Sequence, residues 1–477
     1  MANKSSLISG IGVLSLSRIA MMVMNFVAVS HMARTLESAN FGTLMFAVSY
    51  VEYFTLVANL GFDNYLPRAI ASQTASRQRL VGSSLLVRFG LAVLLLPLVL
   101  LSLLFLQVGP SAKWVIVIIA SSMFTSAVGL TSVYAGLQRM NVVAARGFGW
   151  SFFNMVGALV LVRGEDDLAA AAVVTVASTT IVNALVFVQY LREFGWPKIR
   201  VDWLSCYVAA RRSSSFLLVL VLASVMSSFK LIVLGIAAND VQVGLFAAAW
   251  RLCQMATIPA NLLATVFLPL IASQFATKQR ADPSETFYKL AILTGLPIAV
   301  GGAVFTPQLV QLFFGPSFDA AVTSTSLLIG GSFLLVLNTV QGTILVAVGA
   351  QKSYVKAMLA GAIASVLLDL AMIPYLGAVG AAVSTLVAQA AISIAYLVLS
   401  RPAVEARRVA GFVARCSLSV AGAVAAGFFL LQAIPFPLHV AVQLAIASSC
   451  AAFTYLLLLW AAGLDLRFFS AEIRRVR

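Results

Sequence analysis

Charged residues are scarce in this chain, and their scarcity limits the kinds of protein that it can be. Only 10% of the 477 residues are Asp, Glu, Lys or Arg, whereas 61% are hydrophobic and the mean hydropathy is +1.01. A soluble domain carries about 25% charged residues. Apolar runs long enough to cross about 30 Å of hydrocarbon recur from end to end. The sequence therefore predicts an all-α polytopic membrane protein.

Cysteine and histidine are also rare, and the common catalytic motifs are missing. The four cysteines form no CxxC pair, and the two histidines have no partner at metal-ligand spacing. No Walker A, GxSxG or HExxH motif is present. We therefore expect no metal, no cofactor and no ATP-driven or hydrolytic chemistry, and we predict that the chain is not an enzyme.

The apolar runs predict about fourteen membrane-spanning helices. The first run lacks a small-residue cleavage site, so we interpret it as a retained helix rather than a signal peptide. The predicted spans are 7–30, 41–62, 80–106, 113–136, 144–162, 168–190, 213–236, 243–272, 287–306, 321–349, 354–374, 378–400, 409–433 and 438–462.

The net charge of +15 is distributed unevenly between the two faces that these spans define. The loops on the side of both termini hold 23 Lys and Arg residues, and the opposite loops hold three: Arg34, Lys113 and Arg163. This bias follows the positive-inside rule and predicts that both termini are cytoplasmic. The basic charge is thus explained by topology, and nucleic acid is not an expected partner.

Two internal similarities indicate a duplication. A shift of 202 residues aligns Gly42 with Gly244, Ala47 with Ala249 and residues 58–60 with 260–262, without a gap. A shift of 213 residues aligns 136–139 with 349–352. Both shifts move the chain by six predicted helices, an even number, so the copies share one orientation. Parallel repeats of this kind are related by an axis along the membrane normal, and the binding site lies between them near the midplane.

The repeat sets the predicted domain boundaries. Residues 1–191 form an N-lobe of six helices, and residues 213–400 form a C-lobe of six helices. A polar cytoplasmic linker, 192–212, joins them, and residues 401–477 add two further helices and a tail.

Seven ionisable residues fall inside predicted spans: Arg18, Glu52, Arg88, Lys230, Arg251, Asp369 and Arg415. A charged side chain at the centre of a membrane helix costs about 2.5–3.5 kcal/mol even on a lenient scale, so most should face a watery cavity or one another. Three helices carry a polar stripe on one face: Ser15, Arg18 and Asn25; Glu52, Thr55 and Asn59; and Arg251, Gln254 and Asn261.

The remaining charged residues within predicted spans allow more than one interpretation. Lys230, with Ser227 one turn before it, resembles the cavity-facing stripes. Arg88 either faces the cavity or snorkels toward the cytoplasm, whereas Arg415 is best read as a snorkelling anchor. Asp369 is either a counter-ion for a cavity cation or a cation or proton site. Because cations outnumber acids, the set favours an anionic substrate, and guanidinium groups suit phosphate in particular.

Several motifs resemble the O-antigen (Wzx-type) polysaccharide flippases of the multidrug/oligosaccharidyl-lipid/polysaccharide exporter superfamily. The resemblance covers most of the chain and is weakest over the last two helices. Its marks are Ala33-Arg34-Thr35-Leu36 before Phe41-Gly42, then Leu60-Gly61, residues 68–71, residues 243–251, Leu268-Pro269 and residues 373–382.

The resemblance implies two six-helix lobes that alternate in access and a cargo of polyprenyl-diphosphate-linked oligosaccharide. This cargo would cross from the cytoplasmic to the periplasmic leaflet of the bacterial inner membrane during surface polysaccharide synthesis. The implied partners are this lipid-linked oligosaccharide, membrane lipid and other polysaccharide-assembly proteins.

We therefore predict a flippase whose cationic cavity holds the diphosphate through Arg18, Lys230 and Arg251, with Arg88 a further candidate. The neighbouring polar residues of the predicted cavity are Asn25, Glu52, Asn59, Gln254 and Asn261, and Glu52 and Asp369 balance charge or couple to an ion. A drug/cation antiporter of the same superfamily is the first alternative, but it would favour acids in the cavity. A membrane polymerase or glycosyltransferase is the second, but no predicted external loop exceeds about 14 residues.

Overall fold

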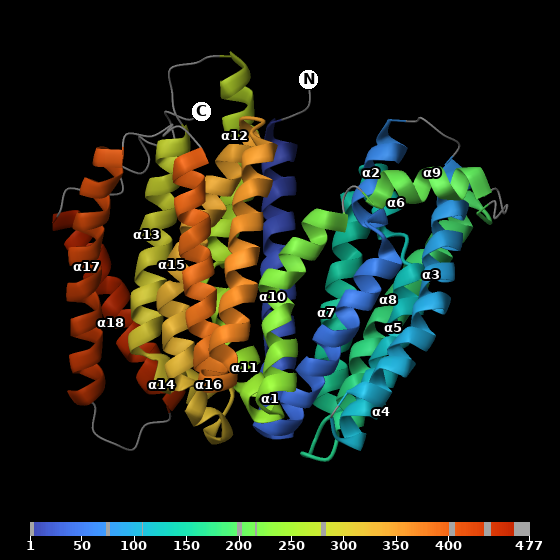
Figure 1. Cartoon of the computed structure of the whole chain (residues 1–477). Coiled ribbons are helices and arrows are strands. Elements are labelled where there is room, and N and C mark those ends of the chain that lie inside the picture. Colours follow the sequence, from blue (N-terminus) through green and yellow to red (C-terminus); the bar gives the residue numbers. More distant parts are fainter. Residues whose placement is uncertain are drawn as a thin grey trace. The chain divides into compact units, whose positions relative to one another are not determined.

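The computed structural model describes residues 4–72, 77–106, 108–197, 203–214, 217–277, 283–399, 406–433 and 440–461. Within these ranges every regular element is a helix (Figure 1). Residues 198–202 of the predicted linker and the tail 462–477 lie outside them. The elements are α1 (Lys4–Asn59), α2 (Phe62–Ala71), α3 (Arg77–Phe105), α4 (Pro110–Ala120), α5 (Ser122–Ala127), α6 (Thr131–Gly136), α7 (Met140–Leu161), α8 (Leu168–Phe194), α9 (Trp203–Ser214), α10 (Leu217–Ala237), α11 (Asp240–Ala256), α12 (Ile258–Thr277), α13 (Pro283–Val304), α14 (Thr306–Phe313), the 3-10 helix η1 (Pro316–Ala321), α15 (Val322–Ala347), α16 (Gln351–Leu399), α17 (Ala406–Ala433) and α18 (Val440–Ala461).

Eleven helical stretches in the described part of the chain are long and apolar enough to cross a membrane, compared with the fourteen spans predicted. Two of the eleven, Ser17–Ala71 and Gln351–Val398, each overlap two predicted spans. The predicted span 144–162 corresponds to α7, which is not among the eleven because Arg146 and Asn154 lower its hydropathy. These three differences account for the lower number, and the chain is a multi-pass all-helical membrane protein.

The two longest helices are each bent at one residue whose backbone is not helical. In α1 this residue is Glu37, with φ 60° and ψ 177°, and in α16 it is Gly377, with φ 53° and ψ −131°. Glycine adopts positive φ without a steric penalty, whereas glutamate does so under strain. The predicted loops between the first and second spans, and between the eleventh and twelfth, are therefore sharp bends rather than open connections.

Two predicted spans are broken instead of continuous. The predicted span 113–136 corresponds to the candidate span Pro110–Gly136, which the chain forms from α4, α5 and α6 with Gly129 in the last break. In the predicted span 243–272, α11 ends at Ala256 and α12 begins at Ile258, so this stretch is two helices rather than one. Pro259 stands in the first turn of α12, where a proline removes no intrahelical hydrogen bond.

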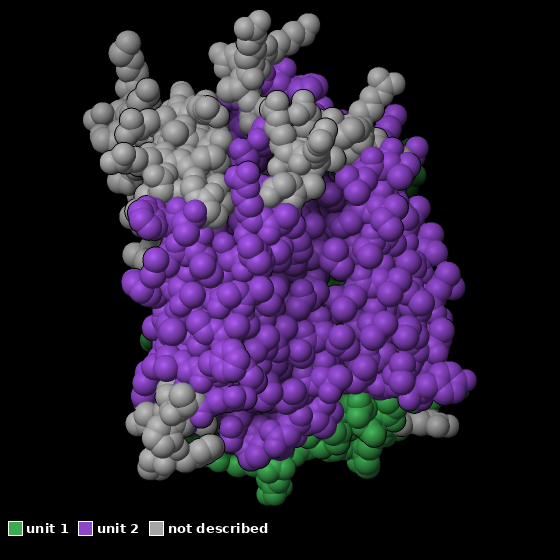
Figure 2. Space-filling model, turned by 90° about the vertical axis from the view of Figure 1, so that its left-hand side faces the viewer, with its two compact units in different colours: residues 1–244 green, residues 245–477 purple. Residues whose placement is uncertain are grey.

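The described chain divides into two compact units, residues 1–244 and 245–477 (Figure 2). The boundaries of the predicted lobes come from a sequence repeat, whereas these units are defined by compactness. The lobes therefore stay a prediction. In unit 1, α1 packs against α3, α4, α7, α8 and α10, and α7 packs along α8.

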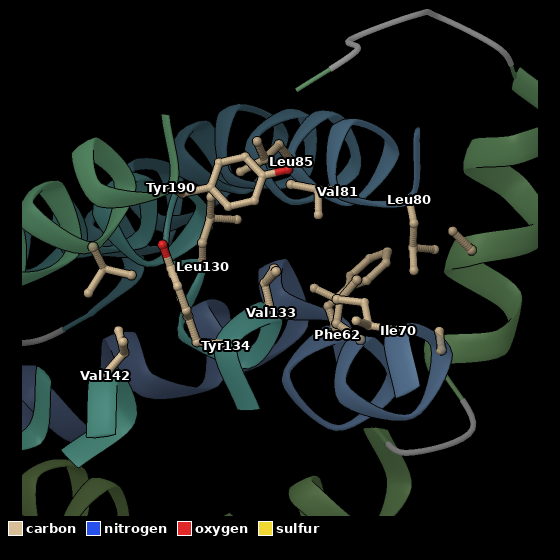
Figure 3. Close-up of a cluster of buried hydrophobic side chains, with 14 residues drawn as sticks. Phe62, Ile70, Leu80, Val81, Leu85, Leu130, Val133, Tyr134, Val142 and Tyr190 are labelled. Atoms are coloured by element: carbon tan, nitrogen blue, oxygen red, sulfur yellow. The ribbon is translucent and has the colours of Figure 1, made fainter. Parts of the chain in front are cut away.

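A core of buried side chains joins α2, α3, α6 and α8 within unit 1 (Figure 3). Phe62, Val81, Val133 and Tyr190 in this core are all fully enclosed. Gly136 ends α6 against α2, and a Cβ atom on it would stand 2.9 Å from the Cα and carbonyl oxygen of Pro67. The short helix α6 is thus held firmly on its core side, which fixes the direction of the polar residues on its other side.

Two repeat-related glycines meet in unit 1, where α1 touches the first turn of α11. A Cβ on Gly42 would stand 1.8 Å from the carbonyl oxygen of Asp240, and one on Gly244 would stand 2.0 Å from that of Ser38. The hydroxyl of Thr43 donates a hydrogen bond of 2.9 Å to the Asp240 carboxylate beside this contact. Only glycine allows backbones to approach so closely.

In unit 2, α15 packs against both α13 and α16, α17 packs on α13, and α18 packs along α17. Ile292 and Leu296 of α13 share a buried cluster with Cys416 of α17 and Tyr455 of α18. The Tyr455 hydroxyl donates a hydrogen bond of 3.0 Å to the Leu293 carbonyl. The last two helices are therefore integrated into this unit through apolar burial.

Candidate functional site

Arg88 lies at the break between α5 and α6 and is only 2% exposed. Its guanidinium donates hydrogen bonds to the carbonyl oxygens of Gly129 (2.9 Å) and Ser126 (2.5 Å). A broken helix leaves carbonyl groups without their usual i+4 donors, and buried carbonyls require partners. The Gly129 N–H donates to the Ser126 carbonyl at 3.0 Å, and Arg88 adds a donor to each of the two carbonyls. Arg88 therefore points into unit 1 and does not snorkel. Asp63 of α2 is the nearest carboxylate, with a nitrogen–oxygen distance of 3.8 Å.

A partly open cavity of about 370 Å³ lies beside Arg88 and is lined by residues of unit 1. Seven helices contribute to its wall: α1, α2, α3, α5, α6, α7 and α8. The polar lining consists of Thr55, Asn59, Asp63, Arg88, Ser126, Thr131, Ser132, Arg146 and Asn183.

Hydrogen bonds fix several of these side chains. Asn183 donates to the Thr125 carbonyl (3.0 Å), which orients its amide so that Oδ1 accepts two bonds from Arg146 (3.2 and 3.3 Å). Asn59 donates to the Asp63 carboxylate at 2.5 Å. The cavity therefore holds two guanidinium groups and one carboxylate on a preorganised polar wall.

The structure brings together part of the predicted set and adds residues that sequence reasoning missed. Asn59 and Arg88, both predicted, share this cavity. Asp63, Arg146 and Asn183 were not predicted as site residues, because Asp63 and Arg146 were assigned to cytoplasmic loops. The helix α7 begins at Met140 rather than at 144, which places Arg146 nearly two turns inside it.

The other predicted residues of unit 1 lie elsewhere. Glu52 on α1 accepts hydrogen bonds from Ser228 (2.7 Å) and Ser224 (3.3 Å) of α10. Lys230 on α10 is 1% exposed. Arg18 is exposed on α1 and Asn25 is half-buried. None of these four residues lines the cavity beside Arg88.

The predicted stripe in unit 2 is divided by the break between α11 and α12. Arg251 contacts Gln254 on α11, with 3.4 Å between Nη1 and Oε1. Asn261 stands on α12 and donates to Thr257 at 3.4 Å. Gln254 and Asn261 are both exposed. The three residues therefore do not share one continuous helical face as predicted.

Asp369 is fully buried in α16. The hydroxyls of Ser365 (3.1 Å) and Ser384 donate hydrogen bonds to its carboxylate. Ser384 lies beyond the bend at Gly377, so the carboxylate ties together the two halves of the bent helix. Within the described residues, no group of three or more His, Cys, Asp or Glu side chains could hold a metal ion.

Comparisons with known proteins agree on the family and on the fold. The model of a family described as "Polysaccharide biosynthesis protein" matches residues 7–275, more than half of the chain. A "Putative O-antigen transporter" of Shigella dysenteriae is 22% identical over 371 residues, which cover 76% of this chain and 91% of that protein.

Two solved structures are similar in fold. The lipid II flippase MurJ in its inward closed conformation matches with a TM-score of 0.76 at 13% identity, covering 94% of this chain and 97% of that one. An inward-facing multidrug resistance MATE family transporter of the MOP superfamily matches with a TM-score of 0.62 at 16% identity, covering 83% and 98%. At these identities the likeness shows the fold alone. With its many membrane-spanning helices and a family match over more than half its length, the chain belongs to the polysaccharide biosynthesis protein family.

Proposed function

We propose that this protein is a flippase for polyprenyl-diphosphate-linked oligosaccharide, which it moves from the cytoplasmic to the periplasmic leaflet by alternating access without altering a covalent bond. The observation that carries the proposal is that cationic side chains are buried in the membrane helices of this chain, which belongs to the polysaccharide biosynthesis protein family. Arg88 is 2% exposed and Lys230 is 1% exposed. Burying such charges in a membrane protein is costly and is retained where it serves ions or charged substrates.

The proposed roles of individual residues follow the sequence analysis. Arg18, Lys230 and Arg251 hold the diphosphate, because guanidinium and ammonium groups form short, charge-assisted hydrogen bonds to phosphate oxygens. Asn25, Asn59, Gln254 and Asn261 offer amides to sugar hydroxyls. Glu52 and Asp369 balance charge or couple transport to an ion.

The names of two similar proteins support this cargo. The curated relative is described as a putative O-antigen transporter, and a solved structure of similar fold is a lipid II flippase. In the proposed topology the protein spans the bacterial inner membrane with both termini on the cytoplasmic side. The lipid-linked oligosaccharide enters from the cytoplasmic leaflet, on that same side. A drug/cation antiporter has support from the MATE-like fold, but the surplus of intramembrane cations disfavours a cationic substrate.

The test is leaflet accessibility of a labelled polyprenyl-diphosphate oligosaccharide in vesicles. We expect wild-type protein to expose the headgroup on the opposite leaflet and an Arg18→Ala/Arg251→Ala double variant not to do so. Arg192→Ala is the matched control, because Arg192 is exposed at the C-terminal end of α8. A wild type that leaves the headgroup in place under every ion gradient would refute the flippase and direct attention to the antiporter.

A further inference from the structure

The short helix α9 stands between two membrane-spanning stretches of unit 1. The chain leaves the candidate span Leu168–Phe194, forms α9, and then enters the candidate span Leu220–Ala237. With 12 residues α9 is about 18 Å long, which is too short to cross about 30 Å of hydrocarbon. In Figure 1 it runs across the end of unit 1 beside α2, where α3 begins. The helix is therefore held at the boundary between membrane and water.

One face of α9 is buried against its own unit. Cys206, Ala209 and Ser213 are all buried, and their spacing of three and four residues puts them on one face of the helix. This face packs against α2 and α3, and Ala209 belongs to the buried core that joins these helices. The contact fixes the rotation of α9 about its axis, and so determines which residues it presents outward.

The outer face of α9 combines an aromatic side chain with two arginines, and we define it as Tyr207, Arg211 and Arg212. Tyr207 is 61% exposed, and both arginines are exposed. Tyr207 and Arg211 are four residues apart and therefore lie on one side of the helix. The sequence of α9 contains no acidic residue. The outer face is thus basic and aromatic, with no carboxylate of α9 to neutralise it.

The two arginines are not required to cap the helix. Carbonyl groups in the last turn of a helix need donors from outside the helical ladder. The Ser213 hydroxyl donates to the Ala210 carbonyl at 3.0 Å. The Ser214 hydroxyl donates to the Arg211 carbonyl at 3.0 Å. Within the described part of the chain, the guanidinium groups of Arg211 and Arg212 form no hydrogen bond or ion pair, so their donors are available to an outside partner.

The level of α9 in the membrane follows from its neighbours on α8. Trp196 stands just beyond the end of α8 and is 73% exposed. Because tryptophan and tyrosine concentrate at the level of lipid headgroups, Trp196 marks that level at this end of unit 1. Tyr190, near the end of α8, shares its buried core with Ala209 of α9. The outer face of α9 therefore lies close to the headgroups, with Tyr207 as a second aromatic residue there.

We propose that the outer face of α9 binds anionic phospholipids of the adjacent leaflet, with Arg211 and Arg212 on the phosphate groups and Tyr207 among the headgroups. Guanidinium groups form paired, charge-assisted hydrogen bonds to phosphate oxygens, and basic residues beside a membrane attract anionic lipids. The ligand is a resident lipid of the membrane and not the transported molecule, so the proposal goes beyond the flippase and does not depend on its cargo. Its consequence is that α9 anchors the connection between α8 and α10 to the membrane surface.

Hydrogen exchange locates the contact without any change to the protein. The full-length protein is placed in nanodiscs of phosphatidylcholine alone, or of phosphatidylcholine with an equal amount of phosphatidylglycerol. We expect the α9 amides to exchange more slowly in the mixed nanodiscs, because the lipid contact stabilises the helix against local opening. Added salt should reduce this difference by screening the charges. Equal exchange of α9 in the two nanodiscs would overturn the proposal and would leave its outer face open to a cytosolic protein instead.

Lipid titration tests the two arginines directly. Native mass spectrometry of the purified full-length protein measures the dissociation constant of phosphatidylglycerol. Arg211→Gln/Arg212→Gln should weaken the tightest binding about tenfold or more, because two charges beside the headgroup are lost. The matched control Arg211→Lys/Arg212→Lys keeps both charges and should stay within about threefold of the wild type.

Two results of the titration would contradict the proposal. One is an unchanged affinity in the glutamine variant, and the other is an equal loss in the lysine variant. Neither this experiment nor hydrogen exchange measures transport, so a failure of lipid binding at α9 is distinguishable from a failure of the proposed flippase.

Discussion

Arg88 shows how one residue joins the stability of the fold to the candidate site. Sequence alone left it between a cavity and a snorkelling role, because a guanidinium one-third of the way along a helix can reach either. The structure resolves the choice through a partner that the sequence could not reveal, which is the broken helix whose Ser126 and Gly129 carbonyls accept hydrogen bonds from Arg88. Asp63 and Arg146 were not predicted as site residues for a related reason. The count of loop charges assigned both to loops, whereas both line the cavity in the structure.

A carboxylate outside the membrane helices provides a residue-scale prediction of pH dependence. The backbone N–H groups of Arg163 (2.8 Å) and Gly164 (2.9 Å) donate to Asp167, and these bonds lower the pKa of Asp167 below its usual value. Because the folded pKa is depressed, the carboxylate stabilises this turn fully above the ordinary aspartate pKa. That contribution disappears as the pH falls through the lowered pKa.

Hydrogen exchange, corrected for the intrinsic rate, measures this effect. We expect the Arg163 and Gly164 amides to be protected at pH 6 and to lose protection progressively in strong acid. Asp167→Asn should remove the protection at pH 6, whereas Asp166→Asn, at an exposed neighbouring carboxylate, should retain it. Protection that is the same in both variants would contradict the assignment.

At the scale of elements, apolar length predicted where the helices run but not where they break. Runs of about 20 apolar residues are sufficient to locate α3, α8 and α13. The bends at Glu37 and Gly377 depend on single backbone conformations. The break at Gly129 is stabilised by a tertiary partner, Arg88, so hydropathy could not reveal it.

Two glycines give a matched element-scale prediction. Gly42→Ala should destabilise the protein by about 2–3 kcal/mol, because its Cβ would stand 1.8 Å from the Asp240 carbonyl and force the backbones apart. Gly90→Ala in α3 should be stabilising by about 0.5–1 kcal/mol, since no atom lies within 4 Å of the added Cβ and alanine favours helix. Thermal unfolding of the two purified variants measures both shifts, and shifts of the same sign would show that the contact is not tight.

At the scale of the whole molecule, composition established a multi-pass helical protein, and the motifs indicated its family. Both conclusions are confirmed by the eleven candidate spans and by the family match over residues 7–275. The lobe boundaries and the orientation in the membrane stay predictions. The candidate cavity was only partly foreseen, because it is built from seven helices whose polar residues are scattered along the first 183 residues.

Reporter fusions test the orientation. A secreted phosphatase joined after Gly164 should be active, because the positive-inside rule assigns the Arg163 loop to the periplasm. The same reporter joined after Gly195, beyond the end of α8, should be inactive, and a fluorescent protein at that point should fluoresce. The reverse pattern would invert the topology and the direction of transport proposed here.

The contact between Gly42 and Gly244 has a consequence for the origin of the chain. These residues occupy equivalent positions in the duplication predicted from the sequence, yet each lies against the other's backbone. A half-length ancestor would have formed a symmetric dimer in which this glycine of one copy contacted the same glycine of the other at the two-fold axis. A single substitution would then have changed both sides of the contact. A fusion of two such copies would free the two positions to change separately, and both are glycine in this chain.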